Sequence, residues 1–127
     1  LKLVNLEEKA KAKFKELSGG QKQRFSICTT LINNPKIIFL DEPTTGLDPQ
    51  ARRNLWELIQ KINSTGTTIM LTTHYMDEAE YCNRITMMVD GVIKALDTPS
   101  NLKQQYSAGN MDDVFFELAR GAKRKAD

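Results

Sequence analysis

The stretch "KIIFLDEP", residues 36–43, decides the fold class of this chain of 127 residues. Its apolar run is followed at once by Asp41, Glu42 and Pro43. A short apolar run that ends in this way predicts a strand buried on both faces, and such strands belong to parallel sheets. A second run, "TTIMLTTH" at 67–74, predicts another strand of the same kind.

Helices are predicted between and around these strands. Ser18 and Asp48 are predicted N-caps, and Leu55, Leu58 and Ile59 recur with Ile62 at helical spacing. The expected helices cover residues 5–17 (with Asn5 as cap), 18–35, 46–66, 75–82, 97–106 (with Thr98 as cap) and 110–127. Residues 84–96 predict a hairpin with its turn at Asp90–Gly91. Strands that alternate with helices indicate an α/β fold with a parallel sheet flanked by helices.

Composition excludes several classes of protein. A net charge of +2 is too small to argue for nucleic acid as a partner. Cys28 and Cys82 show no metal-binding spacing and are expected to be reduced core thiols. The longest apolar runs are far below the roughly 18 residues of a membrane-spanning helix, and the first residues do not resemble a signal peptide. Any association with a membrane is therefore expected to be peripheral.

Polar residues follow both predicted strands, where parallel sheets bind ligands. Asp41 and Glu42 end the first strand, and Thr72, Thr73 and His74 end the second. Neighbouring carboxylates can divide the work of phosphoryl transfer, one holding hydrated Mg²⁺ and the other facing a water molecule. The alternative is that they only end the strand. The single histidine could contact a phosphate or an attacking water, or it could be structural.

A third candidate is the serine and glycine pair that opens the predicted helix 18–35. Helix N-termini bind anions, and glycines allow a phosphate to approach the backbone closely. Ser18 would add a hydroxyl donor beside Gly19 and Gly20. The alternative is an ordinary N-cap followed by flexible glycines.

Together these segments resemble the nucleotide-binding domain of ABC-type ATPases. "LSGGQ" at 17–21 is similar to the signature motif, "KIIFLDEP" to the Walker B strand, "GLD" at 46–48 to the D-loop, and His74 to the switch histidine. The resemblance covers nearly the whole chain and implies part of a P-loop NTPase fold. Residues 1–127 would then be the C-terminal part of one domain. Residues 1–34 would contribute to its helical subdomain, and 35–127 would supply the other motifs, a hairpin and C-terminal helices.

The resemblance also implies roles for single residues. Asp41 would hold Mg²⁺ through water, Glu42 would act as general base, and His74 would contact the γ-phosphate of ATP. Asp48 would couple two active sites across a dimer. The residues expected to bind the ATP held by the opposite subunit are Ser18, Gly19, Gly20 and Gln21.

The resemblance implies the ATP-hydrolysing subunit of a membrane exporter, since "MDDVFFELAR" at 111–120 is similar to the C-terminal helix of drug- and polysaccharide-exporting relatives. Its partners would be a transmembrane permease and a second nucleotide-binding domain, with no nucleic acid. Its place would be the cytoplasm, at the inner face of the cell membrane. Two alternatives stay open: an SMC-like ATPase associated with DNA, and a soluble ABC-type factor that acts on ribosomes.

No phosphate-binding loop of the form G-x-x-x-x-G-K-[ST] occurs in the 127 residues. We therefore expect the chain to be the C-terminal half of such a domain and to be inactive alone. Its strands would lack sheet neighbours, so we also expect it to self-associate.

Overall fold

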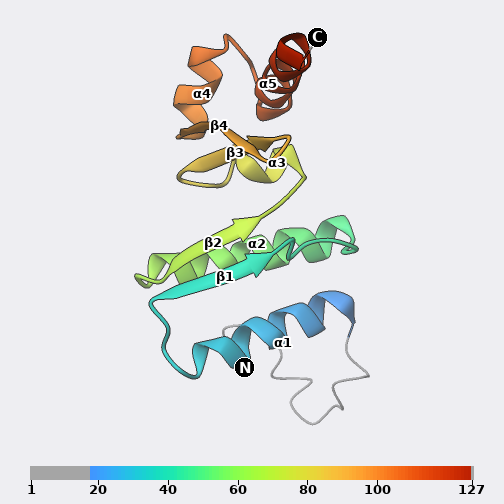
Figure 1. Ribbon diagram of the computed structural model, residues 1–127. Coiled ribbons are helices and arrows are strands. Elements are labelled where there is room, and N and C mark those ends of the chain that lie inside the picture. The colour runs from blue at the N-terminus through green and yellow to red at the C-terminus, as the bar shows by residue number, and fades with distance from the viewer. Residues whose placement is uncertain (1–17, 127) are drawn as a thin grey trace. The chain divides into compact units, whose positions relative to one another are not determined.

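The structure, a computed structural model, describes residues 18–126, with side chains described up to residue 121 (Figure 1). The helix predicted at 5–17, with Asn5 as its cap, lies outside these residues. The described residues divide into two compact units, one ending at Thr72 and the other beginning at Thr73.

The first unit is a β–α–β arrangement preceded by a helix. Its elements are α1 (Gly19–Leu31), β1 (Ile37–Asp41), α2 (Pro49–Ser64) and β2 (Thr68–Thr72). The two strands pair in parallel, from Ile37 opposite Thr68 to Asp41 opposite Thr72. The helix α2 provides the crossover that joins two parallel strands (Figure 1). The α/β class and the parallel pairing predicted from the sequence are confirmed.

The core of the first unit is built on the apolar face of α2. Leu55, which is 0% exposed, lies in a stripe with the other buried side chains of this helix, Trp56, Leu58, Ile59 and Ile62. The helix packs against β2 and against α1, and Ile38 of β1 and Ile27 of α1 are buried as well. Each such side chain contributes roughly 1.5–3 kcal/mol by its burial. The predicted helical spacing of these apolar residues is confirmed.

The prediction that both faces of the two strands are buried is wrong. On β1, Phe39 is 73% exposed and Ile37 is also exposed, and Met70 on β2 is 61% exposed. Side chains alternate between the faces of a sheet, and in residues 18–126 helix packing covers only the opposite face. The apolar run reflects two faces that both suit burial, of which the described residues cover one.

Side-chain caps begin the helices where the sequence predicts them. The capping bonds are Gln21 N–H to Ser18 Oγ at 3.1 Å, Ala51 N–H to Asp48 Oδ1 at 2.8 Å and Asn101 N–H to Thr98 Oγ1 at 3.2 Å. Each bond satisfies a backbone donor that has no partner within its helix. Pro49 and Pro99 follow two of these caps, a position that tolerates proline because its missing N–H would be unpaired there. The three predicted N-caps are confirmed.

The second unit packs a hairpin and three helices together. Its elements are α3 (Met76–Ala79), β3 (Ile85–Val89), β4 (Val92–Asp97), α4 (Pro99–Gln105) and α5 (Met111–Ala126). The strands β3 and β4 are antiparallel. Asp90 and Gly91 join them with φ angles of 52° and 76°, the left-handed pair that a two-residue hairpin turn requires. The predicted hairpin and its turn are confirmed.

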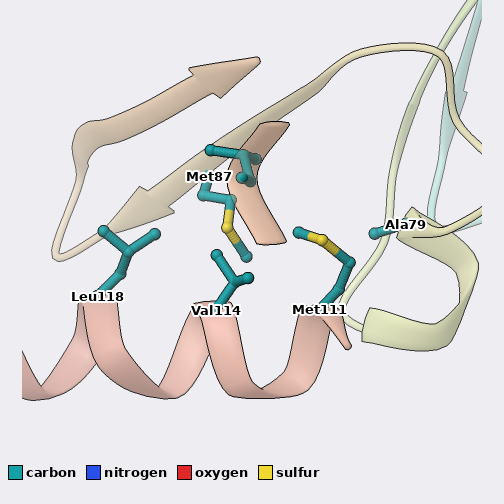
Figure 2. Packing of buried hydrophobic residues seen from close by; sticks show 6 residues of the cluster. Ala79, Met87, Met111, Val114 and Leu118 are labelled. Atoms are coloured by element: carbon teal, nitrogen blue, oxygen red, sulfur yellow. The ribbon is translucent and has the colours of Figure 1, made fainter. Parts of the chain in front are cut away.

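The core of the second unit lies between α5 and the hairpin. Figure 2 shows Met111, Val114 and Leu118 pointing from α5 toward Met87 of β3, with Ala79 of α3 beside them. The three residues of α5 recur at spacings of three and four, so they share one side of the helix.

Among the described residues, none of the helices combines the length and apolar character that crossing a bilayer requires.

Asp97 ends β4 and connects it to α4. Its Oδ1 accepts hydrogen bonds from Asn101 Nδ2 at 2.9 Å and from the backbone N–H of Thr98 at 2.7 Å. These two bonds, that of Asn101 first, hold the pKa of the Asp97 carboxyl below its usual value. The ionised form is therefore the one that supports this junction. Its contribution is full above the usual pKa of an aspartate and is lost as pH falls from there through the lowered pKa.

Candidate functional site

The carboxyl ends of β1 and β2 lie side by side, and their polar groups are bonded to one another. Thr72 Oγ1 donates to Asp41 Oδ1 at 2.5 Å. The backbone N–H of Glu42 donates to Thr72 Oγ1 at 2.9 Å and to the Thr72 carbonyl at 3.1 Å. One threonine of β2 therefore fixes both acidic residues at the end of β1. The role of Thr72 depends on the register of the two strands, which sets Asp41 opposite Thr72 and which the sequence pattern does not specify.

Glu42 leaves the strand direction immediately after Asp41. Its φ angle is 46°, in the left-handed region that non-glycine residues rarely adopt. The two hydrogen bonds from Glu42 N–H to Thr72 hold this conformation. Both acidic side chains are exposed. A backbone held in a sparsely populated region beside exposed polar groups is typical of functional sites.

Asp41 is a suitable ligand for a hydrated magnesium ion. Mg²⁺ keeps several of its waters and binds through one or two carboxylates together with phosphates of a substrate. Within residues 18–121, no group of three or more His, Cys, Asp and Glu side chains could hold a metal by itself. An exposed carboxylate whose Oδ1 is oriented by Thr72 fits contact with an ion through water.

The N-terminus of α1 is closed by a reciprocal pair of hydrogen bonds. Ser18 Oγ accepts from the N–H of Gln21, and Gln21 Oε1 accepts from the N–H of Ser18 at 3.0 Å. This capping box uses the side-chain carbonyl of Gln21 locally, a role that we did not predict from the sequence. The pattern S-x-x-Q at 18–21 was sufficient to reveal it. The Ser18 hydroxyl accepts in this bond, so its own proton is available to donate to an anion.

Gly20 lies at a close approach between α1 and α2. A Cβ atom at this position would lie 3.0 Å from the Cβ of Ala51, whereas one on Gly19 would lie 3.6 Å from Leu47 Cδ2. The first distance is too short for an unstrained contact, and the second is an ordinary one. The two glycines therefore differ. Gly20 permits the close packing of α1 on α2, whereas Gly19 has room for an added Cβ atom. The sequence predicts anion binding for both glycines and does not predict this packing role of Gly20.

Asp48 lies in the same region, because it caps α2 just before Ala51. Its Oδ1 accepts from the Ala51 N–H, and its side chain is exposed. The structure thus brings the start of α1 next to the start of α2, the segment that contains Asp48. The predicted site residues at 18–21 and at 48 are neighbours within the first unit.

His74 belongs to the second unit, in the segment between β2 and α3. Its side chain is exposed, and its ring lies 4.2 Å from the ring of Tyr75, between centroids, at a tilt of 35°. An exposed imidazole held against an aromatic ring can contact a polar ligand.

Comparison with known proteins relates the chain to transport ATPases. A family model described as ABC transporter matches residues 1–45. The chain is 51% identical over 92 residues to "Nod factor export ATP-binding protein I" of Burkholderia thailandensis. The aligned segment covers 72% of this chain and 30% of that protein. It is 45% identical over 104 residues to "Probable multidrug ABC transporter ATP-binding protein YbhF" of Escherichia coli. This aligned segment covers 82% of this chain and 18% of that protein.

A solved structure has a similar fold. It is the dimeric form of an ATP-binding cassette in a post-hydrolysis state, bound to ADP and Pi. The similarity has a TM-score of 0.64 and 37% sequence identity, and it covers 76% of this chain and 43% of that one. The chain thus spans about a third of the length of the curated Nod factor relative and less than half of this structure.

The difference between the two glycines predicts different effects of alanine. Gly20→Ala is expected to lower the free energy of unfolding of the full-length protein by about 1 kcal/mol more than Gly19→Ala, because an added Cβ overpacks the contact with Ala51. The matched variant gains a similar helix propensity without the clash. Urea unfolding measures both values. Equal stability, or a more stable Gly20→Ala variant, would contradict the assigned packing role.

Proposed function

The chain belongs to the ABC transporter ATP-binding family, and on this premise we propose that its full-length protein binds and hydrolyses ATP to drive export across a membrane. The fold is part of the α/β P-loop NTPase fold of that family. The observation that carries the proposal is the pair of exposed carboxylates, Asp41 and Glu42, held at the end of a parallel strand by Thr72. The name of the Nod factor export relative supports the direction of transport.

Hydrolysis would use the two carboxylates differently. Glu42 would accept a proton from the attacking water, and its left-handed backbone, held by Thr72, would keep its carboxylate clear of the strand. Asp41 would hold Mg²⁺ through water. When bound, this ion would neutralise negative charge that develops on the phosphates. His74 would donate a hydrogen bond to the γ-phosphate from its exposed ring.

Two copies of the domain would share each nucleotide. The capped N-terminus of α1, residues 18–21, would bind the ATP held by the other copy, since it combines backbone N–H groups with the Ser18 hydroxyl. Asp48, at the neighbouring start of α2, would then transmit closure between the two sites. The dimeric relative bound to ADP and Pi supports this arrangement.

The remaining assignments are also proposals. Residues 1–34 and 35–127 would be parts of a single ATP-binding domain, in which both described units take part. A transmembrane permease would be its partner, and the domain would lie in the cytoplasm against the inner face of the membrane. The names of the two relatives, one of which describes export and the other an ABC transporter, support such a partner.

Glu42→Gln is expected to slow ATP hydrolysis by the full-length protein by about a hundredfold or more, because the amide cannot accept the proton from water. Glu57→Gln, a change at an exposed glutamate on α2, serves as the matched control and is expected to leave the rate unchanged. A phosphate-release assay with Mg²⁺ and ATP measures both. Full hydrolysis by Glu42→Gln would exclude this residue as the base.

The 127-residue chain by itself is expected to self-associate and to release no phosphate from ATP. Self-association is expected because the apolar sheet face formed by Ile37, Phe39 and Met70 is not covered by any described residue. Phe39→Ser is expected to reduce the mass found by light scattering at micromolar concentration. Phe116→Ser, at a phenylalanine of similar exposure on α5, is the control. A monomer before any substitution would contradict self-association through this face.

A further inference from the structure

The segment that presents His74 is held by one hydroxyl group. Thr73 Oγ1 accepts a hydrogen bond from the backbone N–H of Tyr75 at 3.0 Å. The same oxygen donates its proton to Glu78 Oε1 at 2.6 Å. The residues immediately before and after His74 are thus linked to each other, and the link is tied to α3.

Glu78 is a firm anchor for this link. It is 1% exposed, one of two buried polar residues among those the structure describes. A buried carboxylate is costly unless its oxygens are bonded, and the short bond from Thr73 supplies one such bond. Glu78 also lies in the first turn of α3, where its N–H donates to the Tyr75 carbonyl at 3.0 Å. Glu78 therefore holds Thr73 through its side chain and Tyr75 through its backbone, on the two sides of His74.

His74 itself stays exposed while its neighbours are fixed. Its ring packs beside that of Tyr75, whose backbone is bonded to Thr73 and to Glu78. The backbone turn at 73–75 and this ring contact both restrict the direction of the imidazole. A residue that must reach a phosphate needs such a preset direction, because a displacement of about 1 Å can cost a hundredfold in rate.

We propose that Thr73 and Glu78 are positioning residues for His74 in ATP hydrolysis. Neither needs to touch the nucleotide: Glu78 is buried, and Thr73 acts through the backbone on both sides of the histidine. This inference rests on the proposed function, in which His74 contacts the γ-phosphate. The competing possibility is a purely structural role, in which the two residues only stabilise α3.

The test is a double-mutant cycle in the full-length protein, with kcat, KM and Tm measured for each variant. Thr73→Val removes the hydroxyl at nearly constant size, and Thr73→Ser restores it. Thr73→Val is expected to lower kcat roughly ten- to a hundredfold while KM changes less than about twofold. Thr73→Ser is expected to recover most of the rate. Combined with His74→Ala, Thr73→Val is expected to cause no further loss, since it acts only through the histidine.

Different outcomes overturn different claims. If His74→Ala leaves kcat unchanged, the proposed role of His74 fails, and the positioning role fails with it. If His74→Ala lowers kcat but Thr73→Val lowers it by the same factor with and without His74, the two residues act independently and only the positioning role fails. An unchanged kcat in Thr73→Val also overturns it.

A second variant covers the case in which Thr73→Val does not fold. Glu78→Leu removes the acceptor of the bond from Thr73 at similar size, so kcat is expected to fall roughly ten- to a hundredfold while KM changes less than about twofold. Glu78→Gln keeps an Oε1 atom that can accept this bond and is expected to recover most of the rate. The His74 ring signals in NMR spectra, assigned by their loss in His74→Ala, are expected to move in Glu78→Leu. An unchanged kcat with unmoved ring signals in Glu78→Leu would overturn the assignment of Glu78 as the anchor.

Discussion

The parallel pairing of β1 with β2 is the interaction on which the candidate site depends. Its register sets Asp41 opposite Thr72, so a single hydroxyl lies within bonding distance of an acidic side chain and of the next backbone N–H. A shift of one residue would turn Thr72 to the other face of the sheet and remove both bonds. The site thus depends on sheet register, and α2 packs against this sheet at β2.

A second constraint operates where α1 and α2 begin. The two helix N-termini are each closed by a side chain, Ser18 and Asp48, and they approach closely because Gly20 has no side chain opposite Ala51. Two N-termini that lie together concentrate partial positive charge, which favours an anion nearby. The two glycines therefore differ in what they provide here: Gly20 permits the packing on Ala51, and the exposed Gly19 leaves room beside its backbone.

The elements predicted well are those whose signals are local. The caps at Ser18, Asp48 and Thr98 and the hairpin turn at Asp90–Gly91 depend on residues a few positions apart, and the structure has all of them. The parallel sheet could be predicted because a short continuous apolar run before Asp41 is typical of a strand in such a sheet. What could not be predicted are bonds between distant residues, such as Thr72 with Asp41, and the packing of Gly20 on Ala51.

The wrong prediction, that both faces of the two strands are buried, also failed because it concerned contacts between residues distant in the sequence. A run such as residues 37–40 shows that both faces of a strand suit burial, but it does not show what covers each face. The exposure of Phe39 follows from the number of layers in residues 18–126 and from no property of the strand itself. The bond of Thr73 with Glu78 was likewise hidden, although the residues are only five apart, because a threonine and a glutamate at that spacing are common without contact.

In the proposed function, the ends of β1 and β2 hold the groups that act on ATP. A crystal structure of the full-length Glu42→Gln protein with ATP and Mg²⁺ would show whether they do. We predict Mg²⁺ within one water of the Asp41 carboxylate, the side chain at position 42 facing the water in line with the γ-phosphate, and Ser18 of a second copy against that phosphate. A nucleotide bound away from Asp41 and from position 42 would contradict this claim.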